Sequence, residues 1–363
     1  MTKSNVEFQA REIRPEDAST LFPDLKAEDF RMLHEGEVSQ MDEVYEVESF
    51  WRDLHLRLRK HKGAMISLYV IVILIIMAII GPLTSPYSYK EQIAKHESMA
   101  PRIPVIEKIG IFTGKETIQG RRGPIELDQY SKIPDGDKTY HYFGTDVLGR
   151  DIYTRTWMGT RISLYIALLA VLVDVLFGLS FGMISGFYGG RVDMVMQRIL
   201  EVINGIPSLV VVTLMILILK PGLLSITVAI ALTGWIGMAR MARAEMLKMK
   251  NREFVLAARS LGARPITLMY REILPNIFSK ILIMSMFSIP NAIFMEAFLA
   301  FIGIGIPMPM ASLGSLINEN FKSLTAHPYM IIPPVLVLAL LMLGFNLLAD
   351  GLRDALDPSM KEL

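Results

Sequence analysis

The side chains of this sequence best suited to chemistry are acids and amides set within long apolar segments. Asp174, Glu201 and Glu296 each lie inside an apolar run, and Asn204 and Asn291 accompany them. A charge at the centre of a membrane helix costs about 2.5–3.5 kcal/mol, so such side chains face protein or a water-filled path. Two interpretations stay open: these residues line a polar pathway through a membrane, or they hydrogen-bond between helices and orient a bundle.

The sequence contains no set of residues with the types and spacing of an enzyme active site or a metal site. The sequence has no Cys, and its six His are isolated in the sequence, without the spacing of metal ligands. Gly110–Thr117 resembles a phosphate-binding loop, but three residues rather than four separate its glycines, and Glu116 stands where Ser or Thr is required. We therefore expect no catalytic residue, no metal site, no cofactor bound by this chain and no nucleic-acid partner.

Six apolar segments must position the acids and amides. The chain has 363 residues, of which 52% are apolar, and the apolar residues are clustered. A run of about 20 apolar residues is long enough to cross a bilayer as a helix. The sequence therefore predicts an all-α polytopic membrane protein with six transmembrane helices, at Ala64–Leu83, Ile162–Ile184, Ile199–Leu219, Leu223–Ala242, Ile281–Ile306 and Met330–Ala349.

Prolines fall inside several of these segments. Pro207 lies within the third, and Pro290 with Asn291 is expected to interrupt the fifth. Backbone carbonyls freed at such a break could line a cavity beside Glu296. The prolines are expected to act as hinges or as ordinary kinks of membrane helices.

Charge divides the rest of the chain into parts. Residues 1–50 hold five Lys and Arg against thirteen Asp and Glu, which predicts an acidic, partly disordered cytoplasmic tail. Residues 51–83 are predicted to form an amphipathic helix followed by the first span, and residues 84–160 to form an extracytoplasmic loop. Residues 161–350 are predicted to form a core of spans two to six, and residues 351–363 a cytoplasmic C-terminus. From Arg240 to Lys280 there are nine Lys and Arg, so this loop and both termini are expected on the cytoplasmic side.

Residues 250–275 form a polar loop between the fourth and fifth predicted spans. Phe254, Ala257, Ala258 and Leu261 recur at helical spacing and share one face. Gly262 is expected to end the first of two short helices as a left-handed cap. Pro265 is expected in the first turn of the second helix, and Pro275 is expected to end or kink that second helix. The flat, small-residue face fits contact with another protein, and an amphipathic helix at the membrane surface is the alternative.

The pattern Ala257-Ala258-x3-Gly262, followed by Leu274-Pro275, resembles the cytoplasmic loop of permease subunits of bacterial ABC importers. Leu256 stands where that family usually has Glu, and Glu272 where it has Ile. The resemblance implies a coupling helix that sits in a cleft of a separate ATPase subunit, which would hold ATP and Mg. The residues implied at this contact are Glu253, Phe254, Ala257, Ala258, Ser260, Leu261 and Gly262.

The predicted extracytoplasmic loop ends in Phe-Gly-Thr-Asp-Val-Leu-Gly-Arg-Asp, whose Gly and Asp residues are typical of turns. This motif resembles the peptide and nickel branch of these importers, in the C-type permease subunit. The motif residues are Gly144, Asp146, Gly149, Arg150 and Asp151.

The resemblance covers residues 50–363 and implies a type I ABC importer permease that works by alternating access in the bacterial cytoplasmic membrane. It implies four partner subunits or proteins: a second homologous permease, two ATPases and an extracytoplasmic peptide-binding protein. Oligopeptides are the expected substrate, and dipeptides or nickel stay open. An ion-coupled secondary transporter is a more distant alternative, against which the absence of a visible inverted repeat argues.

Overall fold

The structure is a computed structural model that describes residues 50–120 and 123–356. The chain divides into two compact units, Met1–Asp53 and Leu54–Leu363. The predicted acidic tail 1–50 lies outside the described residues except for Phe50, and so do residues 357–363 of the predicted C-terminal part. Helix α3 (Phe50–Lys60) begins just before the second unit, and every other described element belongs to that unit.

Within the described residues, five helices are long and apolar enough to cross a membrane. The first is α4 (Lys62–Thr84) and the last, Pro328–Leu356, contains α15 (Ile332–Leu356). The other three are composite. One consists of α5 (Ile152–Val173), a π-helical turn (Asp174–Gly178) and α6 (Leu179–Tyr188), and another of α9 (Leu223–Gly234) and α10 (Ile236–Met249). The third consists of α12 (Pro265–Thr267), a π-helical turn (Leu268–Ile273), α13 (Leu274–Leu299) and a further π-helical turn (Ala300–Ile304). The predicted helical, polytopic fold class is confirmed.

The third predicted span, Ile199–Leu219, is wrong as a straight helix. Helix α7 begins earlier, at Gly190, and ends at Asn204, and α8 (Ser208–Leu219) follows after a bend of 78°. Pro207 stands at the bend, where its missing N–H cannot continue the helical ladder. The pair counts as a sixth span only if both halves are taken together.

The fifth predicted span also differs from its expectation. Pro290 does not interrupt it, because α13 runs without a break from Leu274 to Leu299. Pro275 does not end a helix either: it lies in the first turn of α13, where the preceding π-helical turn leads into it. The backbone leaves helical geometry at Gly303 instead, whose φ is 87°.

The segment between α4 and α5 holds a β-hairpin that the all-helical expectation omitted. Strand β1 (Lys115–Gly120) pairs antiparallel with β2 (Gly123–Asp128), with Lys115 opposite Asp128. Helix α5 begins at Ile152, so residues 152–160 are helical rather than part of a loop; α15 likewise includes residues 351–356. The shorter helical turns are η2 (Ala94–His96), η3 (Ile106–Ile109), η4 (Tyr130–Lys132), η5 (Gly136–Lys138) and η9 (Pro328–Met330), and α11 (Glu253–Ser260) and α14 (Leu313–Phe321) complete the described elements.

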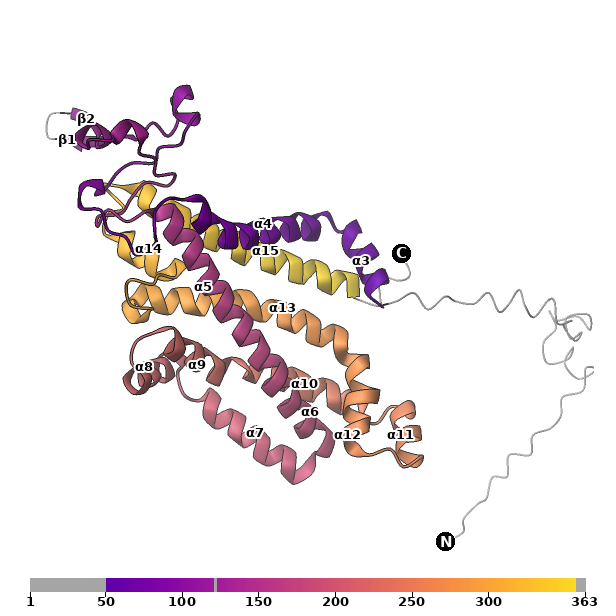
Figure 1. The fold of residues 1–363 in the computed structure, drawn as a ribbon. Coiled ribbons are helices and arrows are strands. Elements are labelled where there is room, and N and C mark those ends of the chain that lie inside the picture. The colour runs from indigo at the N-terminus through magenta and orange to yellow at the C-terminus, as the bar shows by residue number, and fades with distance from the viewer. Residues whose placement is uncertain (1–49, 121–122, 357–363) are drawn as a thin grey trace, which may run out of the picture. The chain divides into compact units, whose positions relative to one another are not determined.

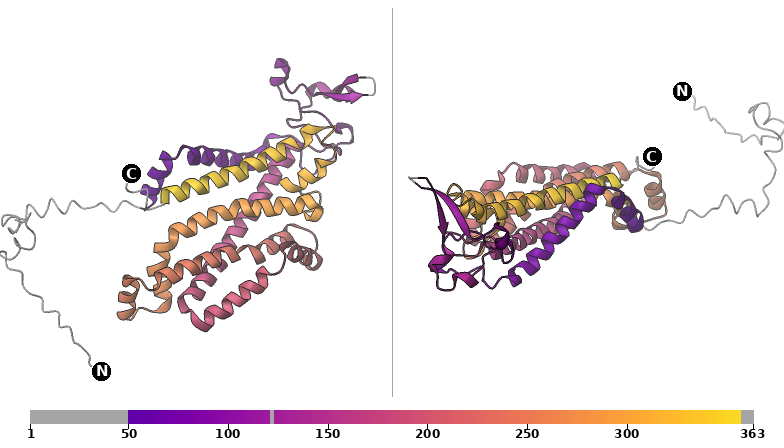
Figure 2. Two further views of the ribbon diagram at one scale, coloured as in Figure 1. Left: turned by 180° about the vertical axis from the view of Figure 1, so that it is seen from behind. Right: turned by 90° about the horizontal axis from the view of Figure 1, so that it is seen from above.

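The two largest apolar cores among the described residues each join several helices. The first packs α4, α5, α13 and α15 and includes Ile71, Trp157, Ile293 and Leu341. The second core joins α6, α10, α11 and the π-helical turn before α13, through buried residues such as Met183, Met238, Met246, Val255, Leu268 and Ile273. Figures 1 and 2 show α14 and the β-hairpin at one end of the bundle, here called the loop end, and α11 and α12 at the other, the α11 end.

Helix α6 meets α10 at unusually short range. A Cβ built on Gly182 would lie 2.2 Å from the backbone oxygen of Ala239, and one built on Gly178 would lie 2.7 Å from that of Trp235. Glycine therefore lets the two backbones touch, as small residues do in membrane helix pairs. This contact fixes α10 against the end of the composite helix that carries Asp174.

Candidate functional site: a polar cavity and an exposed helix

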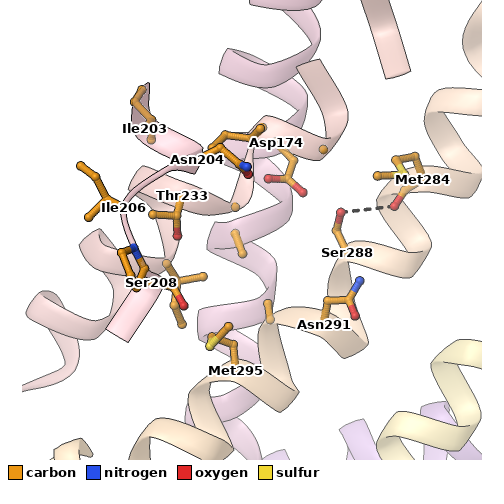
Figure 3. A pocket seen from close by; sticks show the side chains of 17 residues that line it. Asp174, Ile203, Asn204, Ile206, Ser208, Thr233, Met284, Ser288, Asn291 and Met295 are labelled. Carbon is orange, nitrogen blue, oxygen red and sulfur yellow. Dashed lines mark hydrogen bonds between the residues drawn. The ribbon is translucent and has the colours of Figure 1, made fainter. Parts of the chain in front are cut away.

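A cavity of about 470 Å³ lies between α5, the α7–α8 bend, α9, α10 and α13. Most of its wall is apolar, as expected among membrane helices, yet polar side chains from five elements meet in it (Figure 3). Asn204 and Ile206 are exposed, so the cavity is open along the α7–α8 bend. Its polar side chains are Asp174, Asn204, Ser208, Thr233, Ser288 and Asn291.

Asp174 is the acidic side chain of this cavity. It begins the π-helical turn after α5 and is only 5% exposed. One of its oxygens, Oδ1, would lie 3.6 Å from a Cβ on Gly234, so the glycine leaves room beside the carboxylate. Ser288 of α13 also lines the cavity, and its hydroxyl donates to the Met284 carbonyl at 3.2 Å (Figure 3).

Three of the five residues predicted to line a pathway come together here: Asp174, Asn204 and Asn291. Glu201 does not, because its side chain is 58% exposed and pairs with Arg198 at 2.7 Å. Glu296 does not line the cavity either; it is fully buried and accepts a hydrogen bond from the Ser163 hydroxyl at 2.9 Å. The structure thus separates a cavity group from a helix-joining group among side chains that the sequence could not distinguish.

The hydroxyls of Ser208, Thr233 and Ser288 were not predicted as site residues. A signal for one of them exists in the sequence, since Met284, Ser288, Asn291 and Met295 recur at helical spacing along one face of α13. The α7–α8 bend that brings in Ser208 carries no comparable signal beyond Pro207.

Helix α11 is the second candidate site, at the α11 end of the bundle (Figure 1). Val255 is its buried residue, and Ala258 is half-buried against the second core. Phe254 and Ala257 are exposed, and Leu261 is 89% exposed. The predicted face is therefore divided: Ala258 helps to anchor the helix, and the remaining three side chains are presented outward.

The other residues predicted for α11 also lie at its surface. Glu253, Ser260 and Gly262 are exposed, and the Ser260 hydroxyl donates to the Leu256 carbonyl at 3.0 Å. Gly262 has a φ of 83°, the left-handed conformation expected of a helix cap. The Arg259 guanidinium lies 5.7 Å from the centre of the Phe187 ring, which holds α11 to the end of α6.

The five motif residues at the loop end form one tight turn. Gly144 and Gly149 have φ values of 77° and 70°, and a Cβ on Gly149 would lie 2.1 Å from the Ile93 carbonyl oxygen. Asp146 accepts from the Arg150 Nε at 2.6 Å and from two backbone N–H groups. Asp151 caps α5 by accepting from the Thr154 backbone N–H at 2.9 Å.

The motif also reaches α14, far along the chain. The Arg150 and Arg155 guanidinium groups donate to the same oxygen of Glu319, at 2.6 Å and 2.9 Å. Arg155 and Glu319 were not predicted as site residues, since neither belongs to a recognisable spacing.

Two histidines that are far apart in the sequence meet in the structure. His96 Nδ1 lies 3.0 Å from His141 Nε2, and His141 Nδ1 lies 2.9 Å from Asp151 Oδ1. Burial, followed by the neighbouring His141, lowers the pKa of the His96 imidazole. Within residues 50–120 and 123–356, no group of three or more His, Asp or Glu has the geometry to hold a metal ion.

Known proteins resemble the chain over most of its length. Residues 178–362 match the family described as binding-protein-dependent transport system inner membrane component, and residues 49–101 match the N-terminal TM domain of oligopeptide transport permease C. The Oligopeptide transport system permease protein OppC of Bacillus subtilis is 40% identical over 314 residues, which cover 86% of this chain and 91% of that protein.

Other relatives carry related names. The Dipeptide transport system permease protein DppC of Lactococcus lactis is 39% identical over 86% of this chain and 92% of its own length. The Oligopeptide transport system permease protein OppC of Escherichia coli K12 is 33% identical over 88% of this chain and 96% of its own length. A structure of the MetNI methionine ABC transporter in an inward-facing conformation aligns with a TM-score of 0.47 at 16% identity, over 55% of this chain and 97% of that one.

The family match and the length of these alignments confirm the predicted resemblance to ABC importer permeases of the oligopeptide and dipeptide group. The chain belongs to the family of inner membrane components of binding-protein-dependent transport systems.

Proposed function

We propose that this chain is the transmembrane permease subunit of an ATP-driven importer that moves oligopeptides across the bacterial cytoplasmic membrane. The cavity around Asp174 carries the proposal, because it gathers amides and hydroxyls inside an otherwise apolar bundle. A peptide presents an N–H and a C=O at almost every residue, and these groups need partners when they leave water. Amide and hydroxyl side chains can both donate and accept, so they suit many peptide sequences.

The chain itself is proposed to have no enzymatic activity. ATP and Mg would bind to two separate ATPase subunits, and α11 would dock on one of them at its exposed face. In this orientation the α11 end and both termini are cytoplasmic, and the loop end is extracytoplasmic, where a peptide-binding protein would deliver substrate. A second, homologous permease subunit would complete the pathway along the open side of the cavity at the α7–α8 bend.

The anchoring of α11 supports alternating access. Val255 belongs to the second core together with Leu268 and Ile273 of the π-helical turn before α13 and with Met246 of α10. Close-packed cores transmit displacement rather than absorb it. Movement of α11 with the ATPase would therefore shift α10 and α13, which form two walls of the cavity.

Nickel fits this cavity less well than peptides do. Nickel is commonly bound by imidazole, and no His is among the residues that line the cavity. Dipeptides are the second candidate substrate, because relatives at 37% and 39% identity are named as dipeptide permeases.

The test is uptake of labelled peptides, from dipeptides to octapeptides, and of nickel in cells with and without this chain. We expect peptides longer than tripeptides to need the chain, and uptake to stop with vanadate or ATP depletion rather than with an uncoupler. Uptake of dipeptides alone would assign the second candidate. Inhibition by the uncoupler with ATP maintained would contradict the importer proposal and favour an ion-coupled transporter.

A further inference from the structure

The acidic side chain of the cavity, Asp174, forms no ion pair with any residue in the described ranges 50–120 and 123–356. Carrying a carboxylate into an apolar region without a cation is costly, so such groups in proteins are normally paired. Asp174 is nonetheless 95% buried by its own chain, and it faces the cavity (Figure 3).

The backbone around Asp174 is also irregular. The helix changes from α to π geometry at Asp174 itself, and Asp174 lines the same cavity as the α7–α8 bend. Single π-helical turns within long helices are frequent at functional sites. Gly234 leaves free space next to Oδ1, so a group larger than a hydrogen can approach that oxygen.

Further features of the cavity favour positive charge. Helix α7 ends at Asn204, so the negative end of its dipole is directed at the cavity. The side-chain oxygens of Asn204, Asn291 and Ser288 can accept hydrogen bonds around a donor held by Asp174. An alkylammonium group has three donors and no acceptor, which matches a carboxylate with amide and hydroxyl oxygens near it.

We propose that Asp174 binds the ammonium group of the transported substrate within the membrane cavity, with Asn204 and Asn291 contacting the adjacent peptide backbone. This inference rests on the proposed function and names the feature of the substrate that the site recognises. The ammonium group is supplied by the free N-terminus of a peptide or by a lysine side chain, which share this chemistry. A cation from the second permease subunit is the competing partner for Asp174.

The absence of Cys from the chain permits a direct measurement of charge in the cavity. Thr233→Cys places one thiol on the cavity wall, at a residue to which the proposal assigns no contact with the substrate. In the assembled importer in membranes, the thiol is labelled with a cationic and with an anionic methanethiosulfonate reagent of similar size. We expect the ratio of the cationic to the anionic labelling rate to be about tenfold higher with Asp174 present than in the Asp174→Asn variant.

Glu201→Gln is the matched control, because it removes a carboxylate from the neighbouring helix outside the cavity. The rate ratio is expected to stay unchanged in this variant. An equal ratio in wild type and Asp174→Asn would overturn the proposal, since it would mean that Asp174 is neutralised by a cation of the second permease subunit or does not act on the cavity.

Peptide protection then identifies the group that is bound. We expect a peptide without lysine and with a free N-terminus to slow labelling of Thr233→Cys at least about fivefold more than its N-acetylated form does. An N-acetylated peptide with one lysine tests the side chain as the source. Equal protection by all three peptides, or a difference that persists in Asp174→Asn, would overturn ammonium recognition. If cells with the wild-type importer take up no peptide, the proposed function is contradicted instead. The ratio of labelling rates does not depend on uptake, so the two failures can be distinguished.

Discussion

The Arg150 guanidinium donates to the Glu319 carboxylate at 2.6 Å and so joins residues 169 positions apart. Arg150 is buried, whereas Glu319 keeps 23% of its side chain exposed. Arg155 donates to the same carboxylate oxygen, and its Nε and Nη1 atoms have no other hydrogen-bond partner among the described residues. One carboxylate of α14 therefore pairs with Arg150, just before α5, and with Arg155, in its first turn, and Asp146 is a second partner of Arg150.

The first prediction concerns this ion pair. Glu319→Gln should release α14 from the motif, because removing one partner of a buried ion pair costs about 3–5 kcal/mol. Hydrogen exchange of residues 313–321 should accelerate in the purified importer. Lys115→Gln is the control, since the Lys115–Glu126 pair is 47% and 63% exposed and such surface pairs contribute about 0–1 kcal/mol. Equal exchange in both variants would show that α14 is held by its apolar contacts instead.

The second prediction concerns Glu296, which joins α13 to α5. Glu296→Gln should keep transport within about twofold of wild type, because the amide oxygen can still accept from Ser163. Glu296→Leu should lower the amount of folded protein, since it leaves the Ser163 hydroxyl buried without its partner at a cost of about 1–3 kcal/mol. Uptake and membrane abundance of both variants provide the measurement. Loss of uptake in a well-folded Glu296→Gln protein would assign the carboxyl group a role in the pathway.

The third prediction is that the stability of the segment 85–151, at the loop end of the bundle, depends on pH. Burial and the neighbouring His141 lower the pKa of His96 from 6.5, whereas Glu91 opposes the shift. The folded loop thus binds a proton less readily than the unfolded chain does. Its stability should be full above pH 6.5 and should fall as the pH decreases from there through the folded pKa.

Hydrogen exchange of residues 85–151 between neutral and mildly acidic pH checks this dependence. His96→Asn should lose the decrease in protection below pH 6.5, because the amide mimics Nδ1 of the imidazole but does not titrate. Unchanged pH dependence in His96→Asn would assign the effect to another group of the loop.

Structural features that depend only on residues close together in the sequence could be predicted from it. Apolar length marked the long helices, Gly262 marked the left-handed end of α11, and the glycines of the loop motif marked its turns, because each is set within a few residues of backbone. Pro290 was overinterpreted, since helices packed on both sides can accommodate a proline that would break an isolated helix.

Features that depend on the packed bundle could not be predicted. His96 and His141 are 45 residues apart, and the helices and turns between them decide that they meet. The same holds for the cavity: Asp174, Asn204 and Asn291 looked equivalent to Glu201 and Glu296, and only the rotation of each helix separates them. A break between α7 and α8 changes that rotation, so one unforeseen bend alters which side chains line the site.

The fourth prediction tests the close contact of α6 with α10. Gly182→Val should lower the thermal stability of the importer, because a Cβ would meet the Ala239 carbonyl oxygen at 2.2 Å and overpacking costs about 1–3 kcal/mol. Gly222→Ala is the control, since its φ of 166° is extended and no atom lies within 4 Å of an added Cβ. A similar melting temperature for both variants would mean that α6 and α10 separate easily.

The last prediction addresses α11 as the contact with an ATPase subunit. Ala258→Glu would place a charge against the second core, where Ala258 is half-buried, and would disturb folding as well as docking. Ala257 is exposed, so Ala257→Glu changes only the outward face. An unpaired charge buried on docking costs several kcal/mol, and we expect affinity for the ATPase to fall roughly 100-fold or more. Ala257→Ser keeps a small uncharged side chain there and should dock normally.

Co-purification with the ATPase measures this effect, and membrane abundance of each variant shows that folding is intact. A crosslink gives an independent check: Ser260→Cys would be the chain's single thiol, on the exposed side of α11. It should react with an ATPase subunit and stay protected from reagents that cannot cross the membrane. Normal co-purification of Ala257→Glu together with labelling of Ser260→Cys from outside would place α11 on the opposite side of the membrane. The cavity around Asp174 would then need another route of coupling to ATP.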